Sequence, residues 1–108
     1  MSVSKQALEA LIAPRRVAVV GATTRQEAAG NRVLLHAAGP RFTGTVVGVN
    51  PRYEEVEGRP CFASLEAMPD TPDCAIMVVA DSRVEAAVED AARAGVKGIV
   101  LLGRLYDP

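Results

Sequence analysis

The sequence predicts an α/β fold, with a doubly wound parallel β-sheet and helices on both of its faces. Four apolar runs of strand length alternate along the chain with segments in which apolar residues recur at helical spacing. The apolar runs show no alternation of polar and apolar residues, which indicates strands that are covered on both faces. Short connections rich in glycine and proline separate these segments. Together these three observations favour strand–helix repeats around a parallel sheet.

In the first half of the chain, each predicted helix ends at residues that stop it. The elements are a short amphipathic helix over residues 4–12, a strand over 17–20, a helix over 30–38, a strand over 45–49 and a polar extended loop over 53–58. Pro14 ends the first helix because proline lacks the amide hydrogen that a helix interior needs. Gly39 and Pro40 close the second helix.

The second half repeats this pattern. Its predicted elements are one or two helical turns over residues 64–68, a strand over 74–79, a helix that starts near Ser82 and a strand over 98–102. Ser82 and Glu85 have the spacing of a capping box, and Gly95 stands where the C-terminal cap of that helix is expected. Right-handed crossovers between the four strands predict the order 3-2-1-4, with the first strand central, in a Rossmann-like arrangement.

Size and composition limit what this chain can do. Its 108 residues, 49% apolar and 23% charged, are sufficient for one domain over residues 1–108, either complete or the truncated N-terminal domain of a longer chain. The net charge of −1 comes without a basic stripe, which argues against nucleic acid as a partner. No apolar run reaches the length of a membrane span, and Cys61 and Cys74 are expected to be free thiols. The chain is therefore expected to be cytoplasmic.

The candidate site follows from the fold, because ligands of doubly wound sheets bind beyond the carboxyl ends of the strands. After the first strand, Gly21 allows a tight turn and a close approach of the backbone to a ligand. Gly30 and Asn31 open the next helix, whose free amides favour phosphate. The loop between them departs from the G-x-G-x-x-G fingerprint of dinucleotide-binding domains. It does carry side chains suited to a pyrophosphate: Thr23, Thr24 and Arg25.

The end of the second strand is more discriminating. Domains that bind NAD usually place an aspartate or glutamate there to hold the ribose hydroxyls of the adenosine. This strand ends instead in Val49-Asn50-Pro51-Arg52, an amide followed by a cation. Such an end is better suited to a ribose that carries a phosphate. The remaining candidate ligands are therefore NADP and coenzyme A, whose ribose carries a 3′-phosphate.

Three segments carry a more specific signal. They are V-A-V-V-G-A-T at residues 17–23, G-N-R-V-L at 30–34 and V-G-V-N-P-R-Y-E-E-V-E-G-R-P-C at 47–61. These segments resemble the CoA-binding domain of the NDP-forming acyl-CoA synthetases, a superfamily that includes the ADP-forming acetyl-CoA synthetases and the succinyl-CoA ligase alpha subunit. The resemblance covers residues 8 to about 102, and the N-P-R-Y-E-E-V-x-G block is its most specific part.

The resemblance implies that the ligand is coenzyme A or an acyl-CoA. Gly21, Ala22 and Thr23 would line the CoA phosphates, with Thr23 in place of the serine that the family usually has. After the last strand the family commonly has a small-residue turn, where this chain has G-R-L-Y-D-P at residues 103–108. That end of the site is therefore atypical.

Further contacts are implied at the ends of the second and third strands. Asn50, Pro51 and Arg52 would lie near the adenosine, with Arg52 in place of the family's usual lysine. This exchange keeps the positive charge and changes its geometry from a point to a fork. Val79 and Ala80 would pack against the nucleotide, although the family usually has proline where Ala80 stands.

The chain is expected to carry no catalytic residue and no metal. In the synthetases a phosphohistidine of a following domain carries phosphate, and an ATP-grasp domain binds the nucleotide. The single histidine of this chain, His36, lies within a predicted helix and is expected to be partly exposed there. The resemblance thus implies further ligase and ATP-grasp domains or subunits as partners.

Three other interpretations remain open. The first is a stand-alone CoA-binding protein, since single-domain members of the superfamily exist. The second is the NAD(P)-binding Rossmann domain of an oxidoreductase, which would share the fold. The third is a regulatory domain that has kept the fold and lost the ligand.

Overall fold

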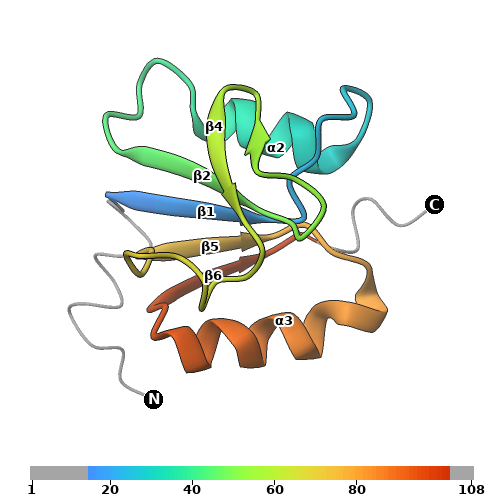
Figure 1. Ribbon diagram of the computed structural model, residues 1–108, viewed down its shortest axis with the longest axis vertical. Coiled ribbons are helices and arrows are strands. Elements are labelled where there is room, and N and C mark those ends of the chain that lie inside the picture. Colours follow the sequence, from blue (N-terminus) through green and yellow to red (C-terminus); the bar gives the residue numbers. More distant parts are fainter. Residues whose placement is uncertain (1–14, 103–108) are drawn as a thin grey trace.

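The computed structural model describes residues 15–102, which form a six-stranded sheet with helices packed on it (Figure 1). The elements are β1 (Arg16–Val20), α2 (Ala29–Ala37), β2 (Thr45–Val49), β3 (Glu55–Val56), β4 (Arg59–Phe62), β5 (Cys74–Met77), α3 (Asp81–Ala94) and β6 (Gly98–Leu101). The helix expected over residues 4–12 and the atypical segment over 103–108 lie outside the described residues.

The sheet and its two helical layers confirm the predicted α/β class. β1 pairs in parallel with β2 and β5, β5 pairs in parallel with β6, and β2 with β4. The short β3–β4 pair is antiparallel. Figure 1 shows α2 on one side of the sheet and α3 on the other.

Alternate side chains of β1 serve two different cores. Val17 and Val19 belong to the buried cluster that contains Leu34 of α2, whereas Ala18 belongs to the cluster that contains Ala91 of α3. Successive residues of a strand point to opposite faces. The run is therefore apolar at every position because both faces of the sheet are covered.

The strand order corrects one detail of the sequence-based prediction. The order is β3-β4-β2-β1-β5-β6, so the four strands predicted from the sequence stand as 2-1-3-4 and the order 3-2-1-4 is wrong. The position outside β2 is taken by β4, which pairs with Gly48 and Val49. The chain then passes to the free edge of β1, where β5 pairs with residues 17–20. β1 remains central, and the strand order reverses between β1 and β5.

The polar segment expected as a loop over residues 53–58 is instead part of a β-hairpin. β3 and β4 are joined by Glu57 and Gly58, which both have a positive φ, of 52° and 74°. Positive φ at both central residues is the requirement of a type I′ turn. Residues 64–68 form only a turn, in which the Ala67 amide donates to the Ser64 carbonyl at 3.2 Å.

The start of α3 also differs from the expectation. Its N-cap is Ala80, which has extended backbone (φ −60°, ψ 150°) and makes no side-chain cap. Ser82 therefore lies inside the first turn and does not cap the helix. The expected C-cap is confirmed, because Gly95 adopts the left-handed conformation with φ 85°.

Neither helix of the described residues is long and apolar enough to cross a membrane. Both cysteines of the chain are free and buried, one in β4 and one in β5. Burial raises the pKa of the Cys61 thiol. Burial, and then the carboxylate of Asp73, raises the pKa of the Cys74 thiol. Both thiols are therefore held in the neutral form.

These raised pKa values predict a loss of stability in alkali. In the unfolded chain the thiols ionise near pH 8.5, while the folded thiols still hold their protons. Folding stability is full below that pH and is expected to fall as the pH rises through the folded pKa values. Urea midpoints measured at pH 7.5, 9 and 10 test this. The variant with both cysteines changed to alanine should show a flatter profile, and identical profiles would contradict the assignment.

Candidate functional site

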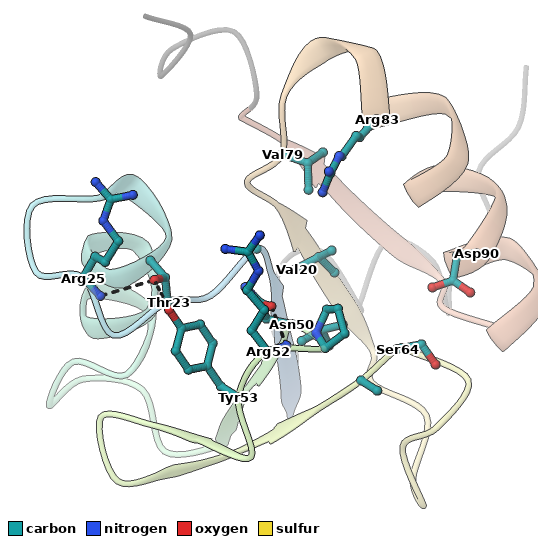
Figure 2. Close-up of a pocket in the computed structure, with 14 residues that line it drawn as sticks. Val20, Thr23, Arg25, Asn50, Arg52, Tyr53, Ser64, Val79, Arg83 and Asp90 are labelled. Atoms are coloured by element: carbon teal, nitrogen blue, oxygen red, sulfur yellow. Dashed lines mark hydrogen bonds between the residues drawn. The ribbon is translucent and has the colours of Figure 1, made fainter.

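A cleft of about 450 Å³ opens where β1, β2 and β5 end (Figure 2). Its walls are formed by the last residue of β1 and the loop after it (Val20, Gly21, Thr23 and Arg25), by the last residue of β2 and the turn after it (Val49, Asn50, Pro51, Arg52 and Tyr53), after β4 by Ala63 and Ser64, and beyond β5 by Val79, Arg83 and Asp90. The cleft lies at the carboxyl ends of the strands and beside the reversal of strand order, which is where ligands of doubly wound sheets bind.

The structure brings together seven of the twelve residues that the sequence nominated. Those that line the cleft are Gly21, Thr23, Arg25, Asn50, Pro51, Arg52 and Val79. The residues that stand outside its wall are Ala22, Thr24, Gly30, Asn31 and Ala80. Ala22 is fully buried and Asn31 is only 1% exposed, so both lie beneath the surface of the cleft wall.

Gly21 is required by both its backbone conformation and its neighbours. Its φ is +98°, and its amide donates to the Val49 carbonyl oxygen at 2.9 Å. A Cβ at this position would lie 2.1 Å from the Val78 carbonyl oxygen. Gly30, in the first turn of α2, packs against the same turn, because its Cβ would meet the Gly21 carbonyl oxygen at 2.0 Å. The two glycines let β1, β5 and α2 converge at one point behind the cleft.

Asn50 connects the loops that follow β1 and β2. Its Nδ2 donates to the Ala22 carbonyl oxygen at 2.9 Å, and its Oδ1 accepts the Arg52 amide at 2.9 Å. Its own amide donates to the carbonyl of Phe62 in β4. The side chain thus shapes the wall of the cleft and fixes the turn that presents Arg52.

Tyr53 and Thr23 meet at one end of the cleft. Their hydroxyl groups are hydrogen-bonded at 3.0 Å (Figure 2). Hydrogen bonding to Thr23, and then to Thr24, lowers the pKa of the Tyr53 phenol below its ordinary value. The Arg25 amide also donates to the Thr23 hydroxyl, at 3.3 Å. The Thr23 hydroxyl group is therefore held both by its own loop, through Arg25, and by the segment after β2, through Tyr53.

The charged residues of the cleft wall are three arginines and one carboxylate, Asp90. Arg25 forms an exposed ion pair with Glu27 at 3.3 Å, an arrangement that contributes little to stability in water. Within residues 15–102, Arg52 and Arg83 form no ion pair. Figure 2 shows their side chains reaching over the cleft from opposite sides. Two unpaired guanidinium groups facing one space favour a ligand with a phosphate group.

The sequence reasoning missed several residues of the wall, notably Tyr53, Ser64, Arg83 and Asp90. Tyr53 could have been found, since it follows Arg52 directly in the N-P-R-Y motif. Arg83 and Asp90 lie on the helix after β5, and no local pattern distinguishes them from other charged residues on an exposed helix face. Ser64 comes from the connection between β4 and β5, whose path depends on the hairpin.

The single histidine of the chain lies apart from the cleft. His36 is exposed on α2 and lines a separate shallow hollow with Leu35 and Phe42. In the described part of the chain, no three histidine, cysteine, aspartate or glutamate side chains are grouped as metal ligands would be.

Comparison with known proteins agrees with this architecture. The family model described as CoA binding domain matches residues 15–108. The ADP-forming acetate–CoA ligase I of Archaeoglobus fulgidus is 39% identical over 95 residues, which are 88% of this chain and 14% of the ligase. The chain thus spans about one seventh of the length of that relative. It is homologous to one part of the ADP-forming acetyl-CoA synthetases.

Solved structures of two kinds share the fold. The dinucleotide-forming acetyl-coenzyme A synthetase 1 of Ca. Korarchaeum cryptofilum, in complex with phosphate and ADP, aligns with a TM-score of 0.78 and 32% identity, over 82% of this chain and 19% of that one. A conserved hypothetical protein from Pyrococcus furiosus aligns with a TM-score of 0.72 and 30% identity, over 82% of this chain and 74% of that one. With a glycine turn, an Asn-Pro-Arg strand end and a family match over nearly all of its length, the chain belongs to the CoA binding domain family.

Proposed function

We propose that this domain binds coenzyme A, as a substrate, in the cleft at the ends of β1, β2 and β5, and that it is the nucleotide-holding part of an acyl-CoA synthetase of the NDP-forming type. The observation that carries the proposal is that the guanidinium groups of Arg52 and Arg83, which form no ion pair among residues 15–102, line the same cleft as the tight turn at Gly21. The guanidinium groups would attract the phosphates of a ligand that lies against the turn.

The parts of coenzyme A can be assigned to parts of the cleft. The pyrophosphate would lie along the loop of Gly21 and Thr23, where Arg25 adds a charge at the rim. The adenosine 3′-phosphate would meet Arg52, whose position at the end of β2 is that of the ribose-binding residue in related folds. The half-buried side chain of Val79 would supply an apolar contact to the nucleotide.

The end of β2 also argues against an NAD-binding oxidoreductase domain. In such domains a carboxylate at this point accepts hydrogen bonds from the ribose hydroxyl groups. Here the Asn50 side chain occupies that point, and its Oδ1 already accepts the Arg52 amide. NADP is the nearest competing ligand, because its ribose also carries a phosphate.

Two settings are compatible with this function. The short alignment to the Archaeoglobus ligase supports a domain that works with further ligase and ATP-grasp domains or subunits, which would supply the catalytic residues. The longer coverage of the Pyrococcus protein supports a stand-alone CoA-binding protein as the alternative. In either setting the two free, buried thiols favour a reducing compartment such as the cytoplasm.

Calorimetric titration with coenzyme A, dephospho-CoA, NAD and NADP tests the proposal. We expect coenzyme A to bind most tightly, and dephospho-CoA to bind about 5- to 150-fold more weakly, because a charge-assisted hydrogen bond to phosphate contributes about 1–3 kcal/mol. Tighter binding of NADP than of coenzyme A would overturn the proposal. Absence of binding by all four would favour a regulatory domain that has lost its ligand.

A further inference from the structure

The turn of the β3–β4 hairpin contains an unfavourable backbone conformation. Glu57 has a φ of +52°, the only positive φ of a residue other than glycine among residues 15–102. Asparagine and glycine tolerate this left-handed region, whereas glutamate is disfavoured there. Type I′ turns accordingly prefer Asn-Gly, and here the pair is Glu57-Gly58. Conformations of this kind persist where the surrounding contacts hold them, often near functional sites.

The contact that holds Glu57 leads to the wall of the cleft. Its Oε1 accepts a hydrogen bond from the Nδ2 of Asn31 at 2.9 Å. The same nitrogen donates its other hydrogen to the Thr23 carbonyl oxygen, also at 2.9 Å. Asn31 is 1% exposed, so water does not compete readily for this amide. The carboxylate therefore determines how the Asn31 amide is oriented, and that amide holds the main chain at Thr23.

Thr23 is also held through its side chain. Its hydroxyl group is hydrogen-bonded to Tyr53, two residues before β3 begins. The segment from residue 53 to 57 thus reaches the loop after β1 by two independent routes. One route ends on the carbonyl of Thr23 and the other on its hydroxyl, so both the main chain and the side chain at this position are fixed.

We infer that Glu57 is a positioning residue, which acts through Asn31 to set the loop of residues 21–25 in the form that receives the phosphates. This inference rests on the proposed function for the identity of the ligand. It adds a role for a residue outside the cleft wall. Asparagine at position 57 would suit the backbone better, but its side chain is one methylene shorter and would not reach Asn31.

The experiment compares Glu57→Asn with Glu57→Gln. The asparagine variant relieves the backbone and loses the contact, so its melting temperature should equal or exceed that of the unmodified protein while coenzyme A binds about three- to tenfold more weakly. The glutamine variant keeps the length and an acceptor oxygen, and its affinity should stay within about twofold. A stability that rises while affinity falls is a result that a purely structural role does not produce.

Hydrogen exchange on the free protein separates this inference from the proposed function. The amides of residues 22–25 should exchange faster in Glu57→Asn than in Glu57→Gln, whether or not coenzyme A is the ligand. If the unmodified protein binds no coenzyme A, the proposed function fails while the exchange result still decides the role of Glu57. Equal exchange and equal affinity in the two variants would overturn the inference. Should Glu57→Asn fail to fold, Glu57→Gly also relieves the positive φ and removes the carboxylate, and it provides the same measurements. Exchange and affinity equal to those of Glu57→Gln would then be the contradicting result.

Discussion

Replacement of Gly21 by alanine is expected to lower the free energy of unfolding by about 2–5 kcal/mol. Two penalties add: a left-handed conformation with a Cβ costs about 1–2 kcal/mol, and overpacking costs about 1–3 kcal/mol or more. The second applies because the new Cβ would lie 2.1 Å from the Val78 carbonyl oxygen, which belongs to the backbone and cannot rotate away. Since a domain of this size has about 5–15 kcal/mol in total, much of the stability would be lost. Urea denaturation measures the loss.

Gly58→Ala is the matched control for this variant. Gly58 also has a positive φ, of +74°, but nothing lies within 4 Å of the Cβ that alanine would add. The control therefore isolates the conformational penalty, and we expect a loss of only about 1–2 kcal/mol. If both variants lost the same stability, the close approach of β1 to β5 would not be what demands glycine at position 21.

Arg52→Ala is expected to abolish most of the preference for coenzyme A over dephospho-CoA. The Arg52 side chain is unpaired within the described residues and lines the cleft, so a phosphate can engage it without breaking an existing ion pair. Its loss should weaken coenzyme A binding about 10- to 100-fold and change dephospho-CoA binding less than about threefold, because only the former carries the 3′-phosphate. Calorimetric titration of coenzyme A and dephospho-CoA into the unmodified protein and into Arg52→Ala gives the four affinities of this thermodynamic cycle.

Two further variants sharpen this test. Arg52→Lys keeps the charge and should retain most of the affinity, with a residual loss that measures the forked geometry of the guanidinium group. Arg41→Ala removes an exposed arginine that precedes β2, at the opposite end of the sheet, and should change neither affinity. An equal weakening of both ligands by Arg52→Ala would contradict the assignment. If Arg83→Ala lost the preference for coenzyme A over dephospho-CoA while Arg52→Ala kept it, the 3′-phosphate would bind beside α3 and not at Arg52.

The sequence was most informative where a feature depends on neighbouring residues. The apolar runs of β1, β2 and β5 identified these strands because they are covered on both faces and so leave an uninterrupted pattern. The run of β6 was equally apolar, although Val100 and Leu101 are exposed at the edge of the sheet. The hairpin escaped notice for the opposite reason. β3 has two residues, and β4 contains Pro60, which lowers the strand signal. The error in strand order follows, since an unrecognised β4 left the edge of β2 apparently free.

The same distinction applies to the candidate site, where some residues could be predicted from the local sequence and others could not. Gly21 and Arg52 were found because they follow predicted strands, where ligands of this fold bind. Arg83 also follows a predicted strand, but it was not nominated because no local pattern distinguishes it from the other charged residues of an exposed helix face. Asn31 was assigned to the ligand from its place at a helix start, whereas the structure buries it and directs its amide to Thr23 and Glu57.

By itself, the sequence determined the α/β class, the glycine turn after the first strand and the family motif after the second, because periodicity, backbone chirality and residue type are local properties. Only the tertiary structure decided which strand lies beside β1, and which side chains share the cleft. Those outcomes depend on crossovers and register that bring Thr23 to Tyr53 and Asn31 to Glu57, across 30 and 26 positions of the chain. No local pattern encodes such pairings, since they arise from how the hairpin and α2 pack around the loop between them.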